Sequence, residues 1–198
     1  MIMKTHYFSI LIYLFFLCIC CQQIYAENGT ERKLREIKKI ITLSEEQTDS
    51  IRYLHQIFSQ KKDSALYKLS DPVDAAQVVY DASKEWHDGF MRQLSEEQRI
   101  RYIHVTSTPE IRAKTQAKVD LLRGLGVYGE EDLSYFYEDI FNYLMKEKVV
   151  YVRDKYHISK QKHNISQLKK MRPQALKEAN NIEKVKHHGR YNGQYYRW

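Results

Sequence analysis

The spacing of apolar residues constrains the fold of this chain most strongly, because they recur every three or four positions along most of its length. Between Pro72 and Leu94 this spacing predicts one long helix with a single buried face. A second long helix is expected from Glu130 to about Tyr156, after a hinge formed by Gly124, Gly126 and Gly129. No stretch alternates apolar and polar residues for long enough to indicate a strand. The sequence therefore predicts an all-α fold, an elongated antiparallel bundle of about six helices.

The three prolines predict helix starts. Asp71-Pro72 and Thr108-Pro109 each pair an N-cap residue with a proline at the first helical position, where the missing N–H has no helical partner. Pro173 either starts the last helix or kinks one. We place a boundary between two helical regions at the second pair, which gives regions 27–106 and 107–188.

The amino terminus predicts export. An apolar run from Tyr7 to Cys21 follows Lys4, is too short to span a bilayer comfortably, and leads to a small residue at Ala26. Residues 1–26 are therefore interpreted as a signal peptide, and the mature protein is expected to be periplasmic or secreted. The alternative is a lipoprotein anchored at Cys21. All three cysteines lie in this leader, so the mature chain cannot form an internal disulfide.

Basic residues are concentrated in the carboxyl-terminal part of the chain. From Lys155 to Trp198 there are eleven Lys and Arg residues against Glu178 and Glu183. Residues 189–198 show no helical periodicity, and we expect them to form a flexible basic and aromatic tail. The candidate residues for binding an anionic surface are Lys169, Lys170, Arg172, Lys184, Lys186, Arg190, Arg197 and Trp198.

A pentapeptide, Leu-Ser-Glu-Glu-Gln, occurs twice, at 43–47 and at 94–98. Each copy is followed by a similar segment, at 51–55 and at 100–104, with two fewer intervening residues in the second copy. The pattern predicts a capping box at each helix start, in which the serine hydroxyl accepts a backbone N–H and the glutamine reaches back to the serine. The glutamates also favour the positive end of the helix dipole. The motif positions are Leu43, Ser44, Gln47, Leu94, Ser95 and Gln98.

Over about residues 34–105, these repeats resemble the Leu-Thr-x-x-Gln (LTxxQ) motifs of small periplasmic helical proteins of the Spy/CpxP type, with Ser44 and Ser95 at the threonine positions. The resemblance implies a thin, cradle-shaped helical bundle, a homodimer, and action as an ATP-independent envelope chaperone or as a stress-sensing partner of a kinase. For the six motif positions it implies a structural role.

No catalytic residues, metal ligands or cofactor site are predicted. Seven histidines of the mature chain offer bases, but no nucleophile elbow, zinc helix motif or phosphate loop accompanies them. The glycines at 124, 126 and 129 match G-x-G-x-x-G, yet no strand precedes them. His157, His163, His187 and His188 are interpreted as solvated surface residues. Basic and aromatic residues alternate near the carboxyl terminus, but export argues against a nucleic-acid partner.

The sequence thus predicts a non-enzymatic, exported binding protein. The first hypothesis is a chaperone-like or stress-response protein whose partners are unfolded or envelope proteins. The alternative is a structural or adaptor protein that docks on an anionic membrane or cell-wall component through its basic carboxyl-terminal region.

Overall fold

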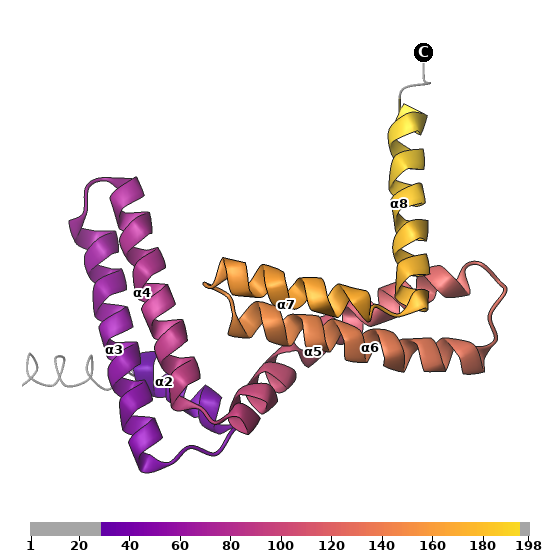
Figure 1. The fold of residues 1–198 in the computed structure, drawn as a ribbon. Helices are drawn as coiled ribbons and strands as arrows, with labels where there is room; N and C mark the ends of the chain where they lie inside the picture. Colours follow the sequence, from indigo (N-terminus) through magenta and orange to yellow (C-terminus); the bar gives the residue numbers. More distant parts are fainter. Residues whose placement is uncertain (1–28, 195–198) are drawn as a thin grey trace, which may run out of the picture. The chain divides into compact units, whose positions relative to one another are not determined.

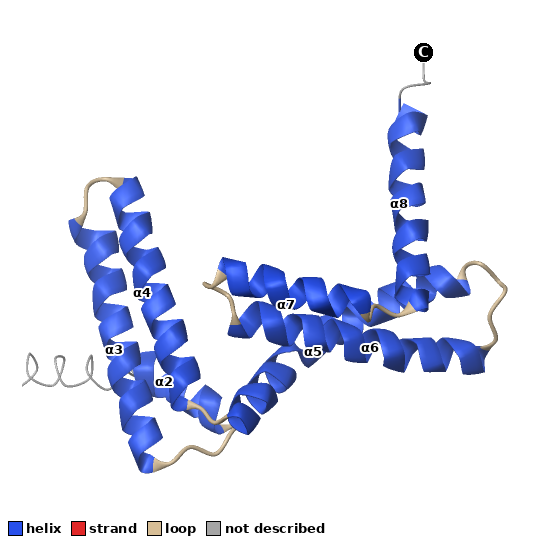
Figure 2. Cartoon of the chain, viewed as in Figure 1, coloured by secondary structure: helices blue, strands red, loops and turns tan. Residues whose placement is uncertain are grey.

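A computed structural model describes the backbone of residues 29–194 and the side chains of residues 29–185. Within these ranges the chain forms seven helices and no strand, which confirms the all-α prediction (Figures 1 and 2). The predicted signal peptide, residues 1–26, and the tail residues Arg197 and Trp198 lie outside the described residues. None of the described helices is both long enough and apolar enough to cross a bilayer.

The chain divides into two compact units between Ser95 and Glu96. The first unit contains α2 (Gly29–Lys38), α3 (Glu45–Lys68) and α4 (Pro72–Gln93), and the second contains α5 (Glu96–Arg123), α6 (Glu130–Arg153), α7 (Ile158–Lys170) and α8 (Gln174–Gln194). The division comes earlier than the predicted boundary at residues 106 and 107, because α5 runs through that position without interruption.

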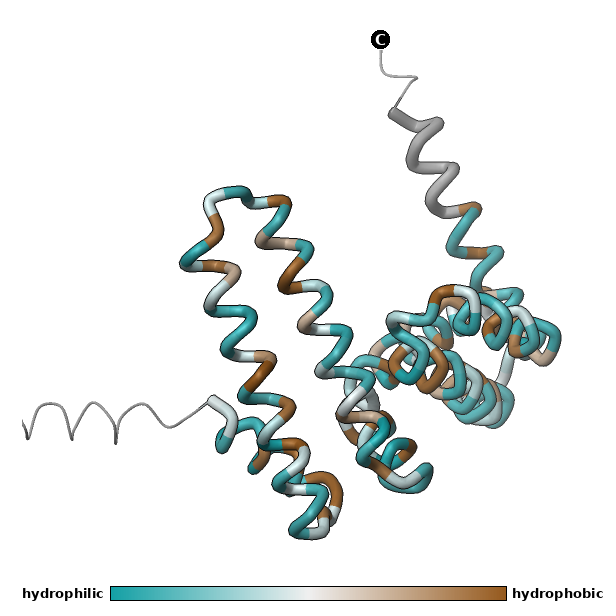
Figure 3. The backbone as a smooth tube through the Cα atoms, turned by 60° about the vertical axis from the view of Figure 1, so that its left-hand side comes forward, coloured by the Kyte–Doolittle hydropathy of each residue, from teal (hydrophilic) through white to brown (hydrophobic). Residues whose placement is uncertain are grey.

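In the first unit, α3 and α4 form a helical hairpin, and α2 packs against α3 (Figure 1). Apolar residues, brown in Figure 3, are interspersed with hydrophilic ones along both hairpin helices, as expected for helices with one buried face. The two helices approach closely at Gly89, where an added Cβ would lie 3.0 Å from the Leu54 methyl groups. Asp71 caps α4 and Pro72 takes the first helical turn, as predicted.

The first Leu-Ser-Glu-Glu-Gln copy forms the predicted capping box. The Gln47 backbone N–H donates to Ser44 Oγ at 3.1 Å, and the Ser44 N–H donates to Gln47 Oε1 at 3.1 Å. Gln47 also donates from Nε2 to the Gln93 carbonyl oxygen at 2.7 Å. Gln93 is the last residue of α4, where backbone carbonyl groups have no hydrogen-bond partner within the helix. One glutamine therefore caps the start of α3 and ties it to the end of α4.

The second copy stands at the start of α5. Ser95 directly precedes Glu96, the first residue of this helix, and Leu94 is buried. Leu43, its counterpart in the first copy, is half-buried.

The prediction that Thr108-Pro109 starts a helix is wrong, since Pro109 lies inside α5. A proline removes one backbone hydrogen bond and crowds the preceding turn. Here, buried Ser107 and Ile111 lie on either side of it, so packing holds the helix together across the proline. The Thr108 hydroxyl donates to the His104 carbonyl at 2.7 Å in the same turn. Tertiary packing thus overrides the local signal.

The core of the second unit lies between α5, α6 and the first turns of α8. Its buried residues are Val119, Leu122, Leu133, Ile140, Tyr143, Ala175, Leu176 and Ala179. The predicted hinge between α5 and α6 is present, with Gly126 at a φ of +70°, a conformation that favours glycine. Helix α7 packs against α6.

Pro173 directly precedes α8, which settles the open choice in favour of a helix start. Its carbonyl accepts from the Lys177 N–H at 3.1 Å. The backbone of α8 continues to Gln194, beyond the predicted helix end at residue 188. We predict a flexible tail from residue 189, but the helical backbone continues through Gly189 and Gly193, because a glycine costs a helix only about 1 kcal/mol relative to alanine.

The position of Pro109 predicts that Pro109→Ala stabilises the protein. A proline within a helix costs about 3 kcal/mol relative to alanine, and the freer unfolded chain of the variant offsets about 0.4–1 kcal/mol of the gain. Thermal unfolding followed by circular dichroism should therefore show a higher Tm. Pro72→Ala is the matched control, because Pro72 occupies a favourable first turn and its loss should leave Tm unchanged or lower. A lower Tm for both variants would contradict the continuous helix.

Candidate functional site

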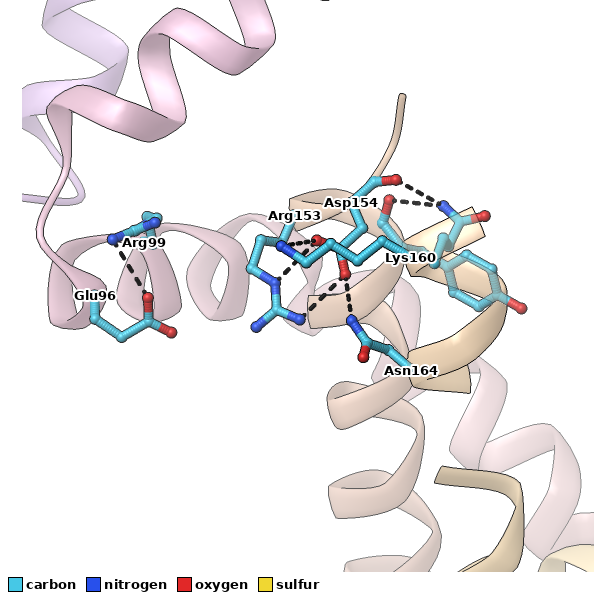
Figure 4. Close-up of polar contacts among 8 residues, drawn as sticks. Glu96, Arg99, Arg153, Asp154, Lys160 and Asn164 are labelled. Atoms are coloured by element: carbon cyan, nitrogen blue, oxygen red, sulfur yellow. Dashed lines mark hydrogen bonds and ion pairs between the residues drawn. The ribbon is translucent and has the colours of Figure 1, made fainter. Parts of the chain in front are cut away.

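A buried carboxylate, Asp154, organises the turn between α6 and α7 (Figure 4). Its residue is only 1% exposed. Arg153 donates to it from Nε at 3.2 Å and from Nη2 at 3.1 Å. From α7, Asn164 Nδ2 donates at 2.8 Å and Lys160 Nζ lies at 3.3 Å. The carboxylate therefore joins the end of α6 to the first two turns of α7.

The charges around Asp154 favour its ionised form. Burial is the largest single effect and raises the pKa of Asp154, but the hydrogen bonds from Arg153, Asn164 and Lys160 and the charge of Arg153 together outweigh it, so the pKa lies below its ordinary value. The hydrogen bond to Asp154 in turn raises the pKa of Arg153. Together with Lys160, the cluster carries a net charge of about +1 at neutral pH.

Beside this cluster, α5, α6 and α7 enclose a groove of about 430 Å³. This volume falls in the range of ligand pockets. The lining residues follow helical spacing on each of the three helices: Ile100 and His104 from α5, Lys146, Val149, Val150 and Arg153 from α6, and Asn164, Gln167 and Leu168 from α7. Because Asp154 fixes α7 against α6, it also fixes one wall of the groove.

The groove combines an apolar surface with cationic groups. Ile100 is 41% exposed within it, whereas Val150 is buried beneath. Lys146 is exposed and forms no ion pair with any described residue. No carboxylate is among the lining residues. Such a site can bind an apolar group that carries a negative charge nearby.

The predicted anionic-surface residues are not gathered into one site. Lys169 and Lys170 are exposed at the end of α7, and Lys184 is exposed on α8. Arg172 instead contacts α6, where it donates to the Tyr143 hydroxyl at 3.4 Å and lies 3.6 Å from Glu147. The side chains of Lys186 and Arg190 lie outside the described residues, as do Arg197 and Trp198.

Sequence reasoning missed the groove, although one signal pointed to it. Ile100 and His104 both belong to the segment that repeats residues 51–55. Val149 and Val150 lie within the helix predicted from Glu130 to about Tyr156, for which no binding role was predicted. Among the described residues, no three His, Cys, Asp or Glu side chains are grouped so that they could hold a metal ion.

Comparisons with protein-family models, with curated proteins and with solved structures find no match.

The Asp154 cluster predicts acid sensitivity of the second unit. Because the folded-state pKa is lowered, the carboxylate stabilises the fold above the pKa of the unfolded chain, about 4, and this contribution is lost as the pH falls through the folded-state value. Asp154→Asn should lower the free energy of unfolding by about 1–3 kcal/mol at pH 7. Urea unfolding at pH 7 and pH 3 should show this difference shrinking.

Glu138→Gln is the matched control, because Glu138 is an exposed carboxylate on α6. This substitution should change the free energy of unfolding little at either pH. Glu110 also titrates at low pH, since Lys114 and Lys148 lower its pKa to about 2. It is present in all of these proteins, so its effect cancels in the comparison. A difference between wild type and Asp154→Asn that stays constant with pH would refute the role of the charged carboxylate.

Proposed function

We propose that the protein is an exported, non-enzymatic binding protein of the helical chaperone kind, which holds apolar segments of unfolded or envelope proteins. The observation that carries this proposal is the groove between α5, α6 and α7, with exposed Ile100 and Lys146 among its lining residues. A concave site lined mainly by apolar surface with a few polar groups is typical of binding sites. The resemblance of the two Leu-Ser-Glu-Glu-Gln motifs to those of periplasmic helical chaperones supports the same function.

The groove suits side chains from one segment of a polypeptide. Its volume is that of a small-ligand site, which a few side chains can fill. An amphipathic segment can place its apolar side chains in such a groove while its polar side remains in water. Binding of this kind needs no nucleotide and no chemistry.

A second candidate function, docking on an anionic surface, is favoured by the composition of α7. This helix carries no acidic residue, and its lysines at 160, 162, 169 and 170 are exposed. Lys160 is engaged by Asp154, whereas Lys162 and Lys169 form no ion pair with a described residue. Salt-sensitive retention on anionic vesicles, without any effect on client aggregation, would favour this function.

The proposed function predicts that Ile100→Gln impairs suppression of aggregation. The purified protein should suppress aggregation of a chemically unfolded client at stoichiometric amounts without ATP, measured by light scattering. Removing the exposed part of an isoleucine from a contact costs about 1 kcal/mol, so the variant should need about fivefold more protein for the same effect.

Val105→Gln is the matched control. Val105 lies on the same helix and is 51% exposed, but it does not line the groove. It should suppress aggregation as well as wild type. Equal activity of both variants and wild type would place client binding elsewhere, and absence of suppression by wild type would overturn the proposal.

A further inference from the structure

We infer that the groove binds an amphipathic helix that carries a carboxylate beside its apolar face. This inference rests on the proposed function and specifies the class of segment that is held. It comes from comparing the two copies of the repeated segment, residues 51–55 and 100–104, which lie in different units.

In the first unit, a helix covers the repeated segment. Thr30 Oγ1 of α2 lies 3.0 Å from His55 Nδ1, and Arg52 Nε donates to Glu31 Oε1 at 2.7 Å. Ile51, one turn before His55, is completely buried. The isoleucine, arginine and histidine of this copy therefore face an amphipathic helix that supplies a carboxylate.

The covering helix has the properties that such a site selects. Leu34 and Ile37 of α2 are both buried, at the three-residue spacing of one helix face. Glu31 lies one turn before Leu34, so the carboxylate stands beside the apolar face. Burial lowers the pKa of His55, and the positive charge of Lys33 lowers it further to a smaller extent.

In the described part of the second unit, no helix covers the corresponding residues in the same way. Ile100 corresponds to Ile51 and is 41% exposed. His104 corresponds to His55 and is also exposed. Both line the groove instead. The second copy thus presents the isoleucine and the histidine of the repeat to the groove, whereas Arg101, which corresponds to Arg52, is not among the lining residues.

The charged residues that line the groove indicate that its partner carries a negative charge. Lys146 and Arg153 line it, and Lys146 forms no ion pair with a described residue. Arg153 is already paired with Asp154 at 3.1 Å, so Lys146 is the lining cation that would meet a partner's charge. A helix with glutamates beside its apolar face complements the charge of Lys146, whereas a helix with lysines there is repelled.

The test uses two fluorescent 14-residue peptides with leucine and isoleucine at the spacing of Leu34 and Ile37. One has glutamates at the flanking positions, and the other has lysines. Fluorescence anisotropy with the purified protein should show at least tenfold tighter binding of the glutamate peptide, and this binding should weaken with salt. Lys146→Glu should weaken it about three- to tenfold.

Lys177→Glu is the control for net charge, because Lys177 is exposed on α8 and does not line the groove. It should leave the affinity unchanged. Equal binding of both peptides, or equal effects of the two lysine variants, would overturn the inference while leaving the proposed function intact. If neither peptide binds but the protein still suppresses aggregation in an Ile100-dependent way, the inference is also overturned and the proposed function remains. If suppression also fails, the proposed function falls with it.

Discussion

The contact between Asp154 and the helices on either side of it determines the form of the second unit's groove. A carboxylate that is 1% exposed is costly to bury unless its charge is compensated. Arg153 and two residues of α7 provide that compensation within 3.3 Å. The need to satisfy one buried charge therefore places α7 along α6, and the apolar face left between α5, α6 and α7 becomes the groove.

The repeated segment has a different structural role in each unit. In the first unit, Gln47 closes the hairpin by capping α3 and binding the carbonyl of Gln93, and α2 covers the segment at 51–55. In the second, the related segment at 100–104 contributes to the groove wall. Similar local sequence thus yields a closed face in one unit and an accessible one in the other, because the covering helix differs. A site of this origin recognises what the first unit already contains, an amphipathic helix.

Features that depend on neighbours in sequence could be predicted, and those that depend on distant neighbours could not. The capping box at Ser44, the start of α4 at Pro72 and the glycine hinge at 124–129 are set by a few adjacent residues, and the structure confirms all three. Whether α5 passes Pro109 depends on the packing of its buried face, which no local pattern reveals. The groove depends on the contact between Asp154 and Asn164, which are ten residues apart in the sequence. Arg172 was predicted to belong to a basic surface, since its ion pair with Glu147 on α6 joins residues that are distant in the sequence.

Site-specific photo-crosslinking tests most directly whether clients occupy the groove. Gln167 and Ser166 are adjacent and exposed on α7, but only Gln167 lines the groove. A photo-crosslinking side chain at position 167 should capture an unfolded client, and the same side chain at position 166 should capture little of it. Equal capture from the two positions, or none from position 167 while the protein still suppresses aggregation, would contradict the assignment of the groove as the binding site.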